Sequence, residues 1–338
     1  MKQAGYLYFY DQTAEYSPIL HLSVLCASSV FSRLHLCLSE RLYTTFSASI
    51  RLPKSVTLHR IEDYSLSSPL IKRLDRLYAG NILSSNCPPV ERHCVNRWIF
   101  LDQNACFGEE ELFCIDWDTL VFRSLESYSD LLEKIDLAAS NLYTLGWHNP
   151  PSEPIWSLCP NMLYIRKPAL EEYLLYLEKY ISYSECYGSI VSGFFCDMQP
   201  WSSVLSAIMV KRSGLAALDF NKHSSALPVV DHNVRILSDC DLEFQEMRYY
   251  FSPGTKTFLN TSYLPAKQIV FSKTYDPFFV LREQSLAVIP EHLNSPNLRA
   301  AACIHFSGVE GKHLLLQTYL DCIRGYLRET LGTHYPIP

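Results

Sequence analysis

Two aspartates set two positions apart are the side chains of this sequence best suited to metal chemistry. Asp116 and Asp118 lie in the segment FCIDWDTLVF, with apolar runs on both sides. On a regular strand they would point to the same face, where two like charges are costly unless a cation neutralises them. Carboxylate oxygens suit Mg²⁺ or Mn²⁺, which usually also bind substrate phosphates. Capping of nearby loops or pairing with arginines is the alternative that this pair alone leaves open.

A second group of candidate side chains lies near the C-terminus. The segment 304–314 reads IHFSGVEGKHL and contains His305, Gly308 and Lys312. By itself, His305 is better explained as a hydrogen-bonded histidine in a strand of small residues than as a metal ligand. Lys312 falls where a helix is expected to begin. A positive charge there opposes the helix dipole, so an anionic ligand explains it better than an ordinary helical position does.

The elements expected around these residues alternate between strands and helices. Apolar runs predict strands at 5–10, 34–37, 56–59, 112–122 and 300–306, with further short strands in 137–166 and 226–272. Helical spacing predicts helices in 18–31, 66–88, 90–102, 127–136, 168–182, 200–213 and 312–331. This alternation is typical of an α/β domain with a mostly parallel sheet. In open sheets of this kind, ligands collect at the carboxyl edge of the strands.

Composition predicts a globular protein with a sizeable core. The 338 residues include 48% hydrophobic and 19% charged side chains, and the formal net charge of −6 gives no support to nucleic acid as the main partner. None of the 12 cysteines forms a C-x-x-C pair, which favours reduced, buried thiols. The sequence has neither an apolar run long enough for a membrane span nor a leader pattern. We therefore expect a cytoplasmic location.

Taken together, the two groups resemble the donor-binding motifs of nucleotide-sugar glycosyltransferases of the GT-A fold. The segments 97–103 and 111–122 are similar to the helix and the metal-binding strand of that fold. The segment 304–314 is similar to the His-x-x-Gly…Lys element of its retaining members, the glycogenin-like and lipopolysaccharide galactosyltransferase-like enzymes. The resemblance implies a single GT-A-like, Rossmann-like α/β domain with a mixed, mostly parallel sheet flanked by helices. Within it we expect a donor half (1–125), an acceptor half (126–300) and a closing segment (301–338).

The resemblance also implies a role for each candidate residue. Asp116, Asp118 and His305 would bind the metal, and Gly308 and Lys312 would contact the donor diphosphate. Lys312 lies seven residues after His305, one more than in the family, and Gly311 can absorb the extra residue. The remaining implied contacts are Asp11 and Tyr16 with the nucleoside base, Arg97 with the diphosphate or sugar, Asn161 with the transferred sugar, and Asp197 as the catalytic carboxylate facing the reacting centre.

The implied function is metal-dependent transfer of a sugar from a nucleotide-diphosphate donor to an unknown glycan or small-molecule acceptor. A UDP-sugar donor, Mn²⁺ or Mg²⁺, and retention of configuration are expected from the resemblance. A metal-dependent nucleotidyltransferase would need a basic loop near the N-terminus, and residues 11–17 contain no lysine or arginine. A non-catalytic binding protein of the same fold is the other alternative, and loss of the metal ligands would be its signature. Motifs of P-loop, dinucleotide-binding and serine-hydrolase proteins are absent from the sequence.

Overall fold

The computed structural model describes residues 3–11, 13–14, 16–64, 68–79, 88–139, 143–145, 155–158, 161–187, 198–220, 232–235, 243–245, 249–252, 257–260, 266–281, 298–306, 312 and 315–338. The α-helices are α1 (Pro18–Val30), α2 (Glu40–Ser49), α3 (Pro69–Ala79), α4 (Pro88–Gln103), α5 (Ser129–Leu132), α6 (Lys167–Tyr187), α7 (Met198–Met209) and α9 (Leu320–Leu331). Shorter helical turns are η1 (Ile61–Asp63), η2 (Ala105–Gly108), η3 (Glu126–Tyr128) and the π-helix η6 (Leu315–Tyr319).

The strands fall into two larger sheets and two hairpins. Those of the first sheet are β1 (Ala4–Phe9), β2 (Arg33–Leu38), β3 (Val56–Arg60), β4 (Glu111–Ile115), β6 (Leu137–Ala139), β9 (Met162–Arg166) and β10 (Ala217–Asp219). Those of the second sheet are β5 (Thr119–Val121), β11 (His232–Arg235), β12 (Glu243–Gln245), β15 (Ala266–Phe271), β16 (Pro277–Leu281), β17 (Leu298–Ala300) and β18 (Cys303–His305). The hairpins pair β7 (Tyr143–Leu145) with β8 (Ile155–Ser157) and β13 (Tyr249–Ser252) with β14 (Thr257–Asn260).

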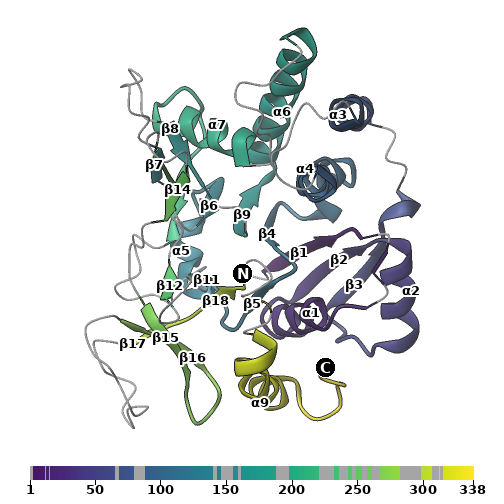
Figure 1. Cartoon of the computed structure of the whole chain (residues 1–338), viewed down its shortest axis with the longest axis vertical. Helices are drawn as coiled ribbons and strands as arrows, with labels where there is room; N and C mark the ends of the chain where they lie inside the picture. Colours follow the sequence, from purple (N-terminus) through teal and green to yellow (C-terminus); the bar gives the residue numbers. More distant parts are fainter. Residues whose placement is uncertain are drawn as a thin grey trace.

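The first sheet is mixed and mostly parallel, as the sequence predicted (Figure 1). Its strand order is β10-β6-β9-β4-β1-β2-β3, and only β9 runs against its neighbours β4 and β6. Nearly every residue of β1 and β2 is buried. Burial on both faces is what a parallel sheet covered by helices requires, and it explains why these strands read as continuous apolar runs.

Helices cover the two faces of this sheet, and successive residues of β1 belong to different cores. Tyr6 and Tyr8 pack into a cluster that includes Trp98 of α4 and residues of α3, α6 and α7. Leu7 points the other way, into a cluster that includes Phe46 of α2 and residues of α1. This alternation follows from the period of two along a strand. The sheet is thereby held between two apolar layers, so the ends of its strands are the places left for polar side chains.

The expected strand in 112–122 is interrupted at its two carboxylates, and the chain changes sheets there. β4 belongs to the first sheet and β5 to the second, with order β17-β16-β15-β12-β11-β18-β5. Between them, the Thr119 N–H donates to the Asp116 carbonyl at 3.0 Å, which closes a turn. Aspartate favours turns because its side chain competes for backbone hydrogen bonds. The candidate metal ligands therefore lie in a connection between two sheets.

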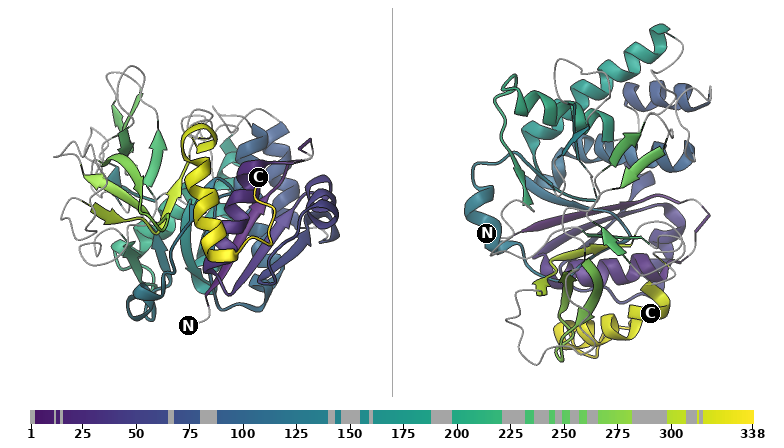
Figure 2. Two further views of the ribbon diagram at one scale, coloured as in Figure 1. Left: turned by 90° about the horizontal axis from the view of Figure 1, so that it is seen from below. Right: turned by 60° about the vertical axis from the view of Figure 1, so that its left-hand side comes forward.

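A third apolar cluster joins the C-terminal helix to this junction. It contains residues of α1, β5, β18 and α9, and α9 (yellow) lies beside α1 (purple) in Figures 1 and 2. A Cβ atom added at Gly325 of α9 would lie 2.5 Å from the ring of Tyr275, in the turn between β15 and β16. This close approach requires glycine. It docks the hairpin of the second sheet against α9.

Other expectations have mixed outcomes. The helix expected at 127–136 is shorter than predicted, because α5 ends at Leu132. The Asp136 N–H donates to the Ala216 carbonyl at 2.9 Å, which begins the pairing of β6 with β10. The helices expected in 168–182 and 312–331 are present as α6 and as η6 followed by α9.

All eight described cysteines are free thiols. Within the described residues, no helix is both long and apolar enough to cross a membrane. The division into donor half, acceptor half and closing segment stays a prediction.

Candidate metal centre

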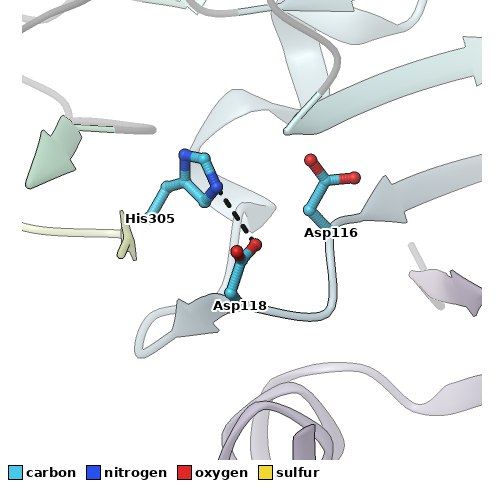
Figure 3. Close-up of side chains that lie close together, drawn as sticks. All are labelled: Asp116, Asp118 and His305. Atoms are coloured by element: carbon cyan, nitrogen blue, oxygen red, sulfur yellow. Dashed lines mark hydrogen bonds and ion pairs between the residues drawn. The ribbon is translucent and has the colours of Figure 1, made fainter. Parts of the chain in front are cut away.

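The side chains of Asp116, Asp118 and His305 form one cluster, which we call the acidic cluster (Figure 3). Their ligand atoms all lie within 4.8 Å of one another, and the structure contains no second group of three such residues among those it describes. Asp118 and His305 are buried, whereas Asp116 is half-buried. Two carboxylates and one imidazole fit a divalent cation, since the oxygens suit Mn²⁺ or Mg²⁺ and the imidazole favours the transition metal of the two.

Two strand pairings bring the members of this cluster together. Along β5 and β18, His305 lies opposite Thr119, and the Phe306 N–H donates to the Asp118 carbonyl at 3.0 Å. Along β4 and β9, the last pair is Ile115 with Met162, and the Asp116 N–H then donates to the Asn161 carbonyl at 2.9 Å. The sheets therefore set the position of each ligand through backbone hydrogen bonds.

His305 is held on both sides of its ring. Its Nε2 lies 3.0 Å from Asp118 Oδ1, and its Nδ1 lies 2.6 Å from the side-chain nitrogen of Asn161. One ring nitrogen thus faces the carboxylates and the other faces an amide. Because Asn161 is itself buried, the ring is held by groups shielded from water. The resemblance placed Asn161 at the transferred sugar, a contact that stays a prediction.

Each aspartate also has a cation from the protein beside it. Lys312 Nζ lies 2.7 Å from Asp118 Oδ2, and it also lies 4.6 Å from the centre of the Trp117 ring. Arg97, which is buried in α4, forms an ion pair with Asp116. Two carboxylates and two cations therefore share one end of the sheet. The contact of Lys312 and Arg97 with a donor diphosphate stays a prediction, and the ion pair of Arg97 with Asp116 is the pairing with arginine that the sequence left open.

The electrostatic state of Asp118 follows from these neighbours. Burial raises the pKa of its carboxyl, but the charges and hydrogen bonds of His305 and Lys312 outweigh burial and hold the pKa well below its usual range. Asp118 is therefore ionised at neutral pH. An ionised carboxylate is the form that binds a metal.

Asp11 and Tyr16 lie in the loop after β1. Asp11 Oδ1 accepts hydrogen bonds from the backbone N–H of Thr13 at 2.8 Å and of Ala14 at 3.1 Å, as an aspartate in a tight turn does. Burial raises the pKa of Asp11, but these hydrogen bonds outweigh burial, so the pKa lies below its usual value. The Tyr16 side chain is 43% exposed, and its hydroxyl lies 3.1 Å from Nδ1 of His21. Their contact with a nucleoside base stays a prediction.

Two candidates, Asp197 and Gly308, lie outside the described residues. One side chain that sequence reasoning missed is Trp117, between the two aspartates. Its ring lies under Lys312 and 4.6 Å from the ring of Phe9, at the end of β1. Its position between the two aspartates was the sequence feature that could have identified it as part of the site. Its contacts depend on the turn between β4 and β5, and the sequence did not predict the conformation of that turn.

No protein-family model and no curated protein matches the chain. Among solved structures, it is similar to mouse xyloside xylosyltransferase 1 in its apo form, with a TM-score of 0.41 and 11% identity over 69% of this chain and 88% of that one. The PaToxG glycosyltransferase matches with a TM-score of 0.38 and 10% identity over 62% and 72% of the two chains. The apo-form glycosyltransferase GlyE of Streptococcus pneumoniae TIGR4 matches with 0.32 and 14% over 66% and 46%. At TM-scores below 0.5 we draw no conclusion about activity from these matches.

Proposed function

We propose that this protein is a metal-dependent glycosyltransferase that transfers a sugar from a nucleotide-diphosphate donor. The observation that carries the proposal is the acidic cluster with Lys312 and Arg97 beside it. A site for a metal ion alone needs no extra cations. Cations next to the metal ligands are what a diphosphate, with its several negative charges, requires.

The chain's own residues would divide the work as follows. Asp116, Asp118 and His305 would hold Mn²⁺ or Mg²⁺, which supplies Lewis-acid stabilisation to a leaving diphosphate. Lys312 and Arg97 would bind the diphosphate oxygens and neutralise the charge that develops as the sugar leaves. Trp117 holds the Lys312 ammonium by a cation–π contact. Asp118, ionised and buried, keeps the site attractive to cations before any donor enters.

The finer parts of the proposal rest on the resemblance of 304–314 to retaining enzymes. They are retention of configuration, a UDP-sugar donor and an acceptor that is a glycan or a small molecule. Asp11 and Tyr16 would contact the base, Gly308 the diphosphate, and Asp197 the reacting centre. A cytoplasmic location belongs to the same proposal.

The test is calorimetric titration of UDP and GDP into the full chain, with and without Mn²⁺. We expect one nucleotide to bind only with the metal, and Asp116→Ala to abolish that binding. Asp75→Ala is the matched control, because Asp75 also pairs with an arginine of α4, Arg92, at 2.8 Å. It should bind as the wild type does.

A second readout separates the enzyme from its alternatives. Incubation with a panel of nucleotide sugars and Mn²⁺ should release nucleoside diphosphate from one donor, with transfer to water in the absence of acceptor. Metal-dependent nucleotide binding without any release would favour a non-catalytic binding protein. Release of pyrophosphate from a nucleoside triphosphate would favour the nucleotidyltransferase. Absence of nucleotide binding with Mn²⁺ present would contradict the proposal.

A further inference from the structure

The amide of Asn161 lies against the one imidazole of the acidic cluster. Its side-chain nitrogen is 2.6 Å from His305 Nδ1, while the opposite ring nitrogen, Nε2, is 3.0 Å from Asp118 Oδ1. Asn161 is 6% exposed. Burial excludes water as an easy substitute partner for Nδ1, so the amide decides which hydrogen bond that nitrogen makes.

A neutral imidazole carries its proton on only one of its two nitrogens. For a neutral ring, the two distances fit Nε2–H donating to Asp118 and Nδ1 accepting from the NH₂ of Asn161. For Nε2 to bind a cation, the proton must instead be on Nδ1, where it needs an acceptor. Asparagine serves both arrangements, because its amide offers two N–H donors and a carbonyl oxygen acceptor. A half-turn of the amide exchanges one for the other.

Asn161 is also tied to the strand that carries the other ligand. Its carbonyl accepts the backbone N–H of Asp116 at 2.9 Å, as a continuation of the β4–β9 pairing. His305 comes from β18, which pairs with β5 in the second sheet. Asn161 therefore connects ligands that two different sheets supply. Its side chain fixes the ring, and its backbone fixes the turn.

We infer that Asn161 is a positioning residue for His305, setting the orientation of the imidazole and the nitrogen that faces the cation. This differs from the direct sugar contact that the resemblance implied for Asn161. The inference rests on the metal site of the proposed function. Partners of this kind, on the far nitrogen of a metal-binding histidine, typically change metal affinity 10–100-fold when removed.

The experiment measures the Mn²⁺ affinity of the full chain at pH 8 by the loss of the free-ion signal in electron paramagnetic resonance. Asn161→Leu should weaken Mn²⁺ binding by about 10–100-fold. In a His305→Ala background the same substitution should change the affinity less than about twofold, since its effect passes through the ring. Asn161→Asp keeps an acceptor for Nδ1–H and should bind within about tenfold of the wild type.

Two controls separate positioning from general damage. Asn104→Leu replaces a half-buried asparagine whose NH₂ donates to the Phe100 carbonyl at 2.8 Å, and it should leave Mn²⁺ affinity unchanged. Thermal unfolding checks that each variant is folded. If Asn161→Leu does not fold, Asn161→Ala, which also removes the partner of Nδ1, is compared in the presence and absence of His305.

Each outcome has a distinct meaning. Wild-type Mn²⁺ affinity in Asn161→Leu would overturn the inference and leave the proposed function standing. An equal loss in the His305→Ala background would also overturn it, because Asn161 would then act independently of the ring. Unchanged Mn²⁺ affinity with weaker binding of a nucleotide sugar would restore the sugar contact instead. If the wild type binds no Mn²⁺, with or without UDP or GDP, the proposed function and this inference fail together.

Discussion

In the part of the chain that the structure describes, histidine lies beside a carboxylate in two clusters whose neighbours differ. In the acidic cluster, His305 lies beside Asp118, with Asp116 near. The other, which we call the imidazole stack, consists of His35, His59 and Phe107. There His35 Nδ1 is 3.1 Å from His59 Nε2, and the Phe107 ring lies 4.7 and 4.4 Å from the two imidazole rings.

The neighbours of each cluster explain the difference. The stack is closed at both ends by hydrogen-bond partners: His59 Nδ1 is 2.8 Å from the Tyr64 hydroxyl, and His35 Nε2 is 3.5 Å from Glu109. The acidic cluster instead gathers a second carboxylate and two cations. A histidine–carboxylate contact is therefore not by itself a metal site. The number of oxygen ligands and the charge around them distinguish the two.

Charge state separates the clusters further. Burial lowers the pKa of His35 and, together with the nearby His35, lowers that of His59 to about 4. Both imidazoles are thus neutral at pH 7. In the acidic cluster, His305 and Lys312 hold the pKa of Asp118 well below its usual range, so this carboxylate is ionised at pH 7. The acidic cluster therefore carries a charged carboxylate, whereas the imidazole stack packs as a neutral aromatic layer.

The largest difference should be in metal binding. Asp118→Ala removes an ionised ligand and should weaken Mn²⁺ affinity by about 1,000-fold, beyond the 10–100-fold typical of outer partners. His59→Gln should leave the affinity within twofold. Both are measured by titration with Mn²⁺. Equal losses in the two variants would remove the distinction between the clusters.

Stability should depend on the stack. Phe107→Ala removes the ring that covers both imidazoles and should lower the free energy of unfolding by about 2–3 kcal/mol, less than for a fully buried phenylalanine because Phe107 is half-buried. Urea denaturation measures the loss, and Mn²⁺ affinity of the folded variant should not change. A loss of metal binding as large as that of Asp118→Ala would mean that the clusters are coupled.

The stack should also make stability depend on pH. The unfolded chain binds a proton at His59 near pH 6.5, whereas the folded chain does so only near pH 4. Between these values protons favour the unfolded state, so the free energy of unfolding falls as the pH falls from 6.5 to 4. His59→Gln should make this decline shallower without removing it, since burial also lowers the pKa of His21 and His93 to about 4. An identical pH profile would contradict the assignment.

The smallest effect should come from the turn that carries Phe107. Ala105, Cys106 and Phe107 have φ values of 46°, 53° and 55°, and Gly108 follows at 80°. A left-handed backbone costs non-glycine residues about 1–2 kcal/mol each. Ala105→Gly removes that cost at an exposed position, but it also increases the conformational entropy of the unfolded chain. The free energy of unfolding should therefore rise by only about 0.5–1 kcal/mol. A matched Ala48→Gly in α2 should destabilise by a similar amount, because it lies in a helix.

The acidic cluster and the imidazole stack also differ in how far the sequence predicted them. Local patterns predicted β1, α1 and α6, and the resemblance of the D-x-D and the distal histidine to GT-A motifs implied the acidic cluster. The imidazole stack was not predicted, because His35 and His59 meet only through the pairing of β2 with β3. Residues 105–107 are not glycines, so their left-handed backbone was not predicted from their residue types. The contact of Asn161 with His305 joins residues 144 positions apart, and no local spacing contains it.

The turn from β4 to β5 is one of the covalent links between the two sheets. Asp116 and Asp118 belong to this link, while His305 reaches them from β18 of the second sheet. A cation coordinated by all three side chains would connect the two sheets noncovalently as well. The cation would then restrict movement of one sheet relative to the other at the site where a donor is proposed to bind. Changes in the relative position of the two sheets would in turn change the Mn²⁺ affinity.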